Sequence, residues 1–136
     1  PDLKARGVDY ENNSRIRPKE YIDNMPVCMA AADLVISRSG ANALSELEAM
    51  GRASILIPSP NVAGNHQYHN AMVLGKAGAA IVIEEKNLTG QVLIDNVNDL
   101  YRDKERLNRF AQRAASLYVP DTPERVFKAL DELIKK

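Results

Sequence analysis

The amino-acid sequence predicts an α/β domain in which helices flank a parallel sheet of about four strands. Three observations lead to this prediction. The hydrophobic pattern switches repeatedly between short β-branched runs and longer stripes with helical spacing. Glycines stand where helices should end, at Gly51 and Gly78. One apolar run, residues 34–36, breaks at Ser39-Gly40 directly into a helical pattern. Together these features are typical of successive strand-helix units.

The four predicted strands are residues 14–17, 34–37, 54–57 and 80–83, of which the first has the weakest pattern. Helices are predicted between them, at residues 26–32, 41–50 and 67–76. Each of these helices is near the minimum length for a right-handed crossover between parallel strands.

After Glu85 the pattern becomes wholly helical, and three amphipathic helices are expected. The first begins at Thr89 as its N-cap, the second follows Asp103, and the third opens at Thr122-Pro123. We expect each apolar stripe to be buried core. The stripes are Leu93, Val97, Leu100 and Tyr101; Leu107, Phe110, Ala111, Ala114 and Ala115; and Val126, Phe127, Leu130, Leu133 and Ile134.

Composition restricts the class of protein. The 136 residues fit one domain with one compact core, and 18 basic residues balance 18 acidic ones. This balance favours neither a nucleic-acid partner nor a polybasic membrane patch. The single cysteine, Cys28, excludes an internal disulfide and is expected to be a small buried hydrophobe in a reducing compartment. No apolar run reaches the about 20 residues that span a bilayer, and no signal peptide is recognised, so we expect a cytoplasmic protein.

The start of the chain does not fit a complete sheet. Residues 1–12 have the pattern of a polar helix end and a loop, whereas a doubly wound domain normally opens with a buried strand and a phosphate-binding turn. We therefore expect the chain to be a piece of a longer protein.

The most informative segment is residues 33–50, in which a predicted buried strand meets a helix at Gly40. The first amides of such a helix have no internal partner, and together with the helix dipole they favour an anion. Glu46, six residues beyond Gly40, lies in the second turn, where a carboxylate can accept hydrogen bonds from a ribose diol. The segment predicts a nucleotide-diphosphate site. The alternatives are an ordinary strand-helix connection and, for Glu46, an ordinary exposed helix residue.

Two segments, DLVISRSGANALSELEAMGRASILIPSP and GNHQYHNAMVLGKAGAA, resemble the C-terminal, donor-binding domain of the MurG family. These bacterial transferases move N-acetylglucosamine from UDP-GlcNAc to lipid I, which gives the peptidoglycan precursor lipid II. The resemblance runs from about Ile16 to the end of the chain. It implies a Rossmann-like donor domain over residues 1–136, incomplete at its N-terminal end, from a two-domain GT-B glycosyltransferase whose acceptor domain is absent. It also implies a full-length protein held peripherally on the cytoplasmic face of the membrane.

The resemblance assigns roles to individual residues. Glu46 matches the glutamate that binds the ribose hydroxyls, and the phosphate-binding turn matches Arg38, Ser39, Gly40 and Ala41. The next two positions, Asn42 and Ala43, present main-chain amides to the phosphates, and Ala43 stands where the family often has threonine. In the loop KEYIDNMP, Ile22 is placed on uracil with Tyr21 beside it.

The sugar is expected at Asn65, His66 and Gln67, where Gln67 matches the better-kept glutamine of the family. His66 stands where some relatives have a second glutamine. Three alternatives concern this group and Arg38. Asn65 is also suited to cap the following helix. His66 and His69 imitate a metal pair that lacks a third ligand. Arg38 is also suited to pair with a surface carboxylate.

The family's reaction is an inverting displacement of UDP, in which Arg38 is a possible stabiliser of the leaving group. The sequence has no paired aspartates of the DxD kind, so no metal or other cofactor is expected for donor binding. The lipid I acceptor would bind the missing domain, and we expect this chain alone not to transfer sugar. Two other functions stay open: the donor half of a different UDP-sugar transferase, such as a glycolipid synthase or a split GlcNAc transferase, and a non-catalytic sugar-nucleotide-binding module.

Overall fold

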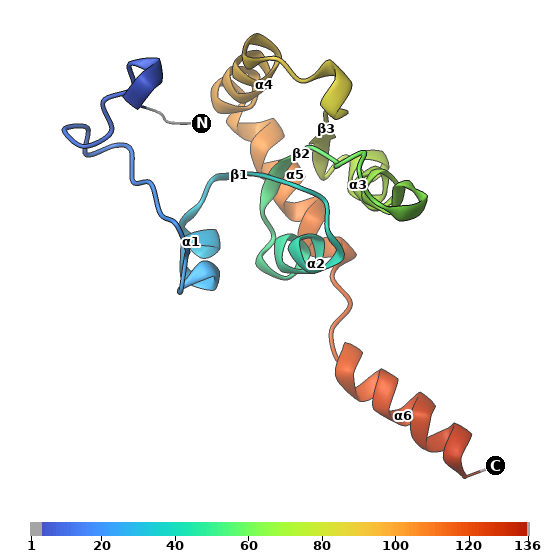
Figure 1. The fold of residues 1–136 in the computed structure, drawn as a ribbon. Helices are drawn as coiled ribbons and strands as arrows, with labels where there is room; N and C mark the ends of the chain where they lie inside the picture. Colours follow the sequence, from blue (N-terminus) through green and yellow to red (C-terminus); the bar gives the residue numbers. More distant parts are fainter. Residues whose placement is uncertain (1–3, 136) are drawn as a thin grey trace.

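The computed structural model describes residues 4–135, which form a three-stranded parallel sheet and six α-helices with three short 3-10 turns (Figure 1). The strands are β1 (Leu34–Ser37), β2 (Ala53–Leu56) and β3 (Ala80–Val82). The helices are α1 (Met25–Ala31), α2 (Ala41–Met50), α3 (His66–Lys76), α4 (Gly90–Arg102), α5 (Lys104–Leu117) and α6 (Thr122–Ile134). The 3-10 turns are η1 (Lys4–Arg6), η2 (Ala63–Asn65) and η3 (Glu85–Asn87).

The sheet has the order β1-β2-β3, with Ile36 beside Ile55 and Ile55 beside Ile81. Three of the four predicted strands are confirmed within one residue. The strand predicted at residues 14–17 is wrong, because this segment is turn and loop in the structure. Its only large apolar side chain, Ile16, is 36% exposed, so the segment buries too little apolar surface to hold a strand in place.

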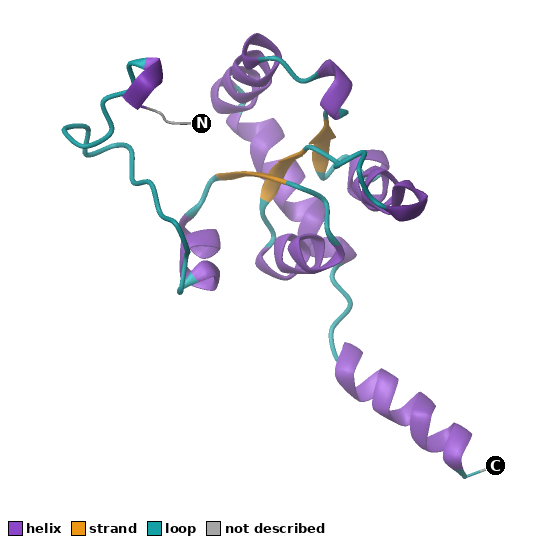
Figure 2. Ribbon diagram, viewed as in Figure 1, coloured by secondary structure: helices purple, strands orange, loops and turns teal. Residues whose placement is uncertain are grey.

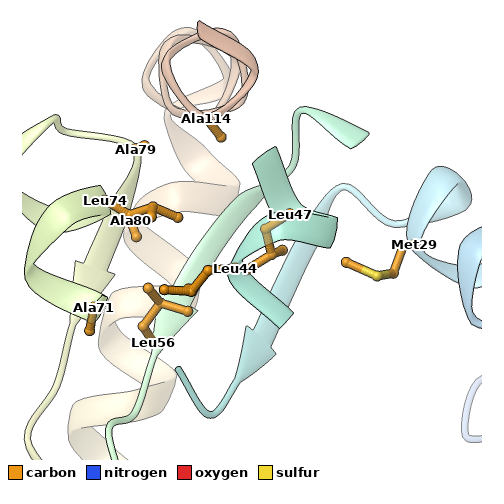
Figure 3. Packing of buried hydrophobic residues seen from close by; sticks show 9 residues of the cluster. All are labelled: Met29, Leu44, Leu47, Leu56, Ala71, Leu74, Ala79, Ala80 and Ala114. Atoms are coloured by element: carbon orange, nitrogen blue, oxygen red, sulfur yellow. The ribbon is translucent and has the colours of Figure 1, made fainter. Parts of the chain in front are cut away.

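Helices flank the sheet (Figure 2), and two hydrophobic clusters lie between the sheet and these helices. One joins α1, α2 and α3 to β2 through residues such as Leu47, Leu56 and Leu74 (Figure 3). The other joins α4 and α5 to β2 through Ile55, Leu100 and Phe110. Because adjacent strand residues point to opposite faces, Ile55 and Leu56 place these clusters on the two sides of the sheet.

Helix ends follow the predicted local rules. The hydroxyl of Thr89 accepts a hydrogen bond from the Val92 amide at 3.1 Å, and the Asp103 carboxylate accepts one from the Arg106 amide at 2.8 Å. Gly51 ends α2 in the left-handed region, at φ 56°, which favours glycine. The predicted N-cap at Thr89 and the predicted helix stop at Gly51 are confirmed.

Burial differs from the prediction at several stripe positions. Tyr101, assigned to the buried face of its helix, is 74% exposed, and Ala115 is also exposed. Cys28 is exposed rather than buried, because Met29 is the residue of short helix α1 that reaches the core.

The largest departure concerns α6, which projects away from the rest of the molecule (Figure 1). Its predicted buried face is wrong: Val126, Phe127, Leu130, Leu133 and Ile134 are between 53% and 83% exposed. A hollow of about 780 Å³ lies between the start of this helix and α2, lined by Ser45, Glu48, Tyr118, Val119, Thr122, Val126, Phe127 and Leu130.

Among residues 4–135, no helix combines the length and the apolar character needed to cross a membrane.

Candidate functional site

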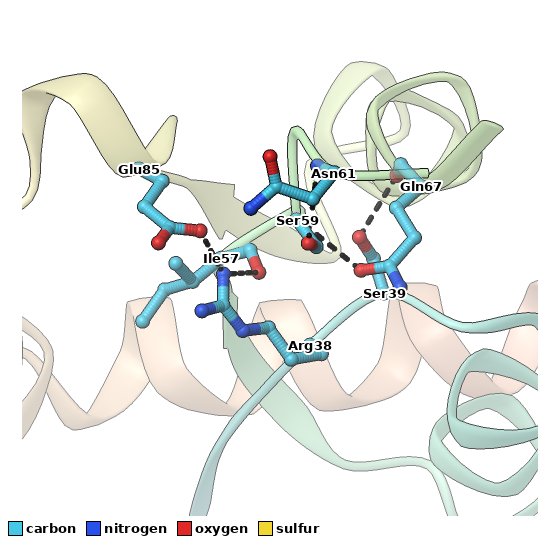
Figure 4. Close-up of polar contacts among 7 residues, drawn as sticks. All are labelled: Arg38, Ser39, Ile57, Ser59, Asn61, Gln67 and Glu85. Atoms are coloured by element: carbon cyan, nitrogen blue, oxygen red, sulfur yellow. Dashed lines mark hydrogen bonds and ion pairs between the residues drawn. The ribbon is translucent and has the colours of Figure 1, made fainter. Parts of the chain in front are cut away.

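The predicted site residues after the strands converge at the carboxyl edge of the sheet. β1 continues into the turn Arg38 to Gly40, β2 into the loop before α3, and β3 into η3. In a parallel sheet these connections all start at the same edge, which is where ligands of open α/β sheets bind. Figure 4 shows side chains from all three connections in contact.

The N-terminus of α2 opens at this edge without a side-chain cap. Gly40 is the N-cap, and the first helical hydrogen bond runs from the Leu44 amide to the Gly40 carbonyl at 3.1 Å. The amides of Ala41, Asn42 and Ala43 precede it, and no side chain caps them, unlike the first turns of α4 and α5. These three amides and the positive end of the helix dipole are therefore available to an anion.

Gly40 leaves open space in front of the turn. Its φ of −66° is one that any residue adopts, and a Cβ atom added there would meet nothing within 4 Å. Neither the backbone nor the packing of this chain requires glycine at this position. Close approach of a ligand is a reason for glycine that fits this geometry.

The turn is held against α3 through Ser39, whose side chain is completely buried. Its hydroxyl donates to the main-chain carbonyl of Gln67 at 2.8 Å (Figure 4). The side-chain amide of Asn70 donates to the Ser39 carbonyl at 3.4 Å. The Ser39 hydroxyl is thus used inside the protein. Sequence reasoning missed Asn70, although its position one helical turn after Gln67 places both residues on one face of α3.

One hydrogen bond fixes the orientation of the Gln67 side-chain amide. Its Oε1 accepts a hydrogen bond from the Ser59 amide at 3.0 Å. A main-chain N–H only donates, so the atom facing it must be the carbonyl oxygen, and Nε2 is the other end. In the described part of the chain Nε2 has no hydrogen-bond partner, which leaves it as a donor for a ligand.

Arg38 spans the edge of the sheet. Its Nη1 donates to Glu85 Oε2 at 2.6 Å and to the Ile57 carbonyl at 3.3 Å. The alternative predicted for Arg38, pairing with a surface carboxylate, is therefore present in the structure. Glu85 was missed because it lies 47 residues away from Arg38; its position just after β3, at the edge that Arg38 also occupies, was the available signal.

Two polar side chains of α2, Asn42 and Glu46, are exposed, and within residues 4–135 neither makes a side-chain hydrogen bond or ion pair. Glu46 lies on the same helix as the uncapped amides, four residues after Asn42, so both side chains lie on one face. The Glu46 carboxylate is free to accept hydrogen bonds from a ligand, and its role with a ribose stays a prediction.

Asn65 and His66 begin α3. Asn65 occupies the N-cap in the left-handed region, at φ 51°, but its side chain makes no capping hydrogen bond. His66 Nδ1 lies 2.9 Å from the Ala63 carbonyl, which only accepts, so this nitrogen is assigned the proton and Nε2 is free. No group of three His, Cys, Asp or Glu side chains in the described residues could hold a metal ion.

Tyr21 and Ile22, predicted at the base, lie on the loop before α1. Tyr21 is 77% exposed and Ile22 is partly buried. Within the described residues no hydrogen bond or ion pair links this loop to the turn or to α3. The structure brings together the predicted phosphate and sugar residues, whereas the contact of this loop with a nucleobase stays a prediction.

Comparison with known proteins adds a family to this geometry. The sequence model of the glycosyltransferase family 28 C-terminal domain matches residues 2–134. A protein of Lactobacillus delbrueckii subsp. bulgaricus, named UDP-N-acetylglucosamine--N-acetylmuramyl-(pentapeptide) pyrophosphoryl-undecaprenol N-acetylglucosamine transferase, is 43% identical over 99% of this chain and 36% of its own length. A protein of the same name from Acetivibrio thermocellus is 44% identical over 98% of this chain.

A solved structure agrees with these relatives. The crystal structure of Acinetobacter baumannii MurG superposes with a TM-score of 0.76 at 27% sequence identity. The match covers 82% of this chain and 32% of that one. The chain thus spans about a third of the length of the curated relatives and of the structure that it matches.

Proposed function

Because this chain belongs to the family of glycosyltransferase 28 C-terminal domains, we propose that it is the UDP-GlcNAc-binding part of an inverting N-acetylglucosaminyltransferase. The full protein would transfer N-acetylglucosamine to undecaprenyl-diphospho-MurNAc-pentapeptide, lipid I, and form lipid II in peptidoglycan synthesis. The observation that carries the proposal is the uncapped N-terminus of α2, which opens at the carboxyl edge beside the free amide of Gln67.

The donor would lie across this edge of the sheet. The amides of Ala41, Asn42 and Ala43 would bind the diphosphate, and the free Glu46 carboxylate would accept hydrogen bonds from the ribose diol. The sugar would lie at the start of α3, where the Gln67 Nε2 and the free His66 nitrogen are available. Ile22 and Tyr21 would receive uracil.

In the proposed reaction the acceptor hydroxyl attacks the anomeric carbon and forms the new C–O bond with inversion. The C–O bond to the diphosphate breaks, and UDP leaves with the electron pair. The hydroxyl proton passes to a base outside this chain. Charge builds on the leaving diphosphate, where preorganised donors contribute a few kcal/mol each. The uncapped amides and Arg38 would supply these donors, so we propose that donor binding needs no metal.

The relatives' printed name includes an undecaprenol-linked substrate, which motivates the proposed lipid acceptor. We propose that the full protein lies peripherally on the cytoplasmic face of the membrane, where such a lipid would be reached. The acceptor site would belong to the part of the relatives that this chain does not match, so we expect the 136 residues alone to bind donor without transferring sugar.

Titration of the chain with UDP-GlcNAc, followed by amide NMR shifts, tests the proposal. We expect shifts at Ile22, at residues 38–46 and at residues 65–67, with no change on addition of a chelator. Glu46→Gln should weaken binding. Glu48→Gln is the matched control, because it makes the same charge change two residues along α2, about 200° around the helix.

Three results would redirect the assignment. Equal affinity for UDP-GalNAc would indicate a transferase with a different sugar. Normal UDP-GlcNAc affinity in Glu46→Gln would favour a binding or interaction module that uses another surface. Lipid II formation by the isolated chain would contradict the expectation that an acceptor domain is required.

A further inference from the structure

The Arg38 side chain lies across the carboxyl edge of the sheet and is held at one nitrogen. It starts at the end of β1, passes the Ile57 carbonyl after β2, and reaches Glu85 after β3. Both hydrogen bonds use Nη1, to Ile57 at 3.3 Å and to Glu85 at 2.6 Å. Figure 4 shows the other two guanidinium nitrogens pointing away from both acceptors.

This arrangement leaves a specific part of the guanidinium free. Arginine has five N–H donors, and Nη1 carries two of them. With both used, the donors of Nε and Nη2 remain, and in residues 4–135 they have no hydrogen-bond partner. These two nitrogens form one edge of the planar group, which binds two oxygens of a phosphate in parallel.

The free edge is accessible. The Arg38 side chain is 52% exposed and that of Glu85 is 39% exposed. Arg38 also lines a hollow of about 240 Å³ together with Ile36, Ser37, Ile57 and Leu88. The turn that Arg38 begins continues along the chain directly into the uncapped amides of α2.

We propose that Glu85 is a positioning residue for diphosphate binding. By holding Nη1 together with the Ile57 carbonyl, it directs the Nε and Nη2 edge of Arg38 toward the diphosphate of the donor. The inference rests on the proposed function, since it takes the carboxyl edge as the donor site. It adds a residue outside the sequence motif and assigns Arg38 a defined binding edge.

Removal of Glu85 has two opposing effects on an anionic ligand. Loss of its negative charge favours the anion, but this pair is about half exposed and solvent screens that contribution. Loss of the hydrogen bond frees a long side chain, whose rotamers must then be ordered when the ligand binds. The second effect prevails, so for ligand binding the hydrogen-bond acceptor at position 85 matters more than the negative charge there.

Two substitutions separate these effects. Glu85→Gln removes the charge and keeps an oxygen acceptor, whereas Glu85→Ala removes both. Glu84→Ala is the matched control, because Glu84 is adjacent, is partly exposed like Glu85, and pairs with Lys86 at 3.0 Å rather than with Arg38. UDP and uridine are the probes, and dissociation constants come from NMR titration of the 136-residue chain.

We expect Glu85→Ala to weaken UDP binding about three- to ten-fold relative to Glu85→Gln, as for the loss of one oriented hydrogen bond. Uridine binding should not change, since uridine has no phosphate. Glu84→Ala should bind UDP like the wild type. In an Arg38→Ala background the difference between the two Glu85 variants should vanish, because Glu85 acts through Arg38.

Stronger UDP binding by both Glu85 variants would overturn the inference, since it would mean that Glu85 competes with the ligand. An equal loss for UDP and uridine, or a loss that persists with Arg38→Ala, would also overturn it and indicate a structural role. Suppose that the wild type binds UDP and that Glu46→Gln weakens this binding, but that Glu85→Ala and Glu85→Gln bind UDP equally. That result would overturn this inference alone. A wild type that binds neither UDP nor uridine overturns the proposed function as well.

Discussion

The Ser39 hydroxyl donates a hydrogen bond to the main-chain carbonyl of Gln67 at 2.8 Å. This contact joins the turn before α2 to the first turn of α3, so the region proposed for phosphate and the region proposed for sugar are held at a set separation. Ser39 is completely buried, and water cannot replace its hydroxyl without a rearrangement.

Ser39→Ala is therefore expected to lower the free energy of unfolding by about 1–2 kcal/mol, because a buried polar contact is lost. Ser37→Ala is the control: that hydroxyl bonds to the neighbouring Arg38 carbonyl at an exposed position, and its removal should change stability by less than about 0.5 kcal/mol. Urea unfolding measures both. Equal losses would contradict a special role for the Ser39 contact.

The orientation of Gln67 predicts a change in ligand preference. Gln67→Glu keeps an acceptor for the Ser59 amide but replaces the free Nε2 donor with an oxygen. We expect the affinity for UDP-GlcNAc relative to UDP to fall about five- to ten-fold, as for one lost hydrogen bond. The ratio corrects for repulsion between the new carboxylate and the diphosphate, which both ligands feel.

Gln91→Glu on α4 is the matched control for that experiment, since the Gln91 side chain bonds to Asp95 and not to a residue of the candidate site. Titration of both variants with both ligands measures the preference. An unchanged preference in Gln67→Glu would mean that Nε2 does not reach the sugar.

Glu48 predicts a pH dependence of stability. Partial burial of Glu48 on α2 removes water from its carboxylate and raises the pKa of Glu48 above its ordinary value of 4.5. As the pH rises past 4.5, Glu48 loses its proton in the unfolded chain before it does so in the folded chain, so the folded state becomes less favoured. Above the raised pKa of Glu48, the full cost of burying the charged carboxylate is present.

Glu48→Gln removes this penalty. The variant should gain stability relative to the wild type as the pH is raised from about 4 to about 7, with little difference at the lower end. Urea titrations at several pH values measure the free energy of unfolding. A gain that is largest at low pH would contradict the direction of the shift.

The two phenylalanines predict unequal losses of stability. Phe110 is 8% exposed in the cluster between the sheet and α4, whereas Phe127 on α6 is 72% exposed. Phe110→Ala should cost about 3–5 kcal/mol, as for a large side chain removed from a core. Phe127→Ala should change the free energy of unfolding of this chain by less than about 0.5 kcal/mol.

Thermal or urea unfolding of the two variants compares them directly. A large loss in Phe127→Ala would show that α6 is packed in solution, and would restore the buried stripe that its sequence spacing predicts.

The sequence by itself determined the elements that depend on neighbouring residues. The β-branched run of β1, the spacing of α2, the cap at Thr89 and the stop at Gly51 all act within one or two turns of chain, so they are readable in order. The Ser39-Gly40 turn was predicted for the same reason.

Only the tertiary structure decided which amphipathic faces find a partner. The stripe of α5 is covered at Phe110 and Ala114, whereas the equally regular stripe of α6 is exposed, because periodicity states which face is apolar and not what lies against it. The Arg38–Glu85 pair and the inward Ser39 hydroxyl also belong here, since their partners lie in η3 and in the first turn of α3, 47 and 28 residues away. Such contacts form because the crossovers make the strands parallel, so that the connections after all three strands start at the same edge of the sheet. No local sequence pattern encodes these contacts.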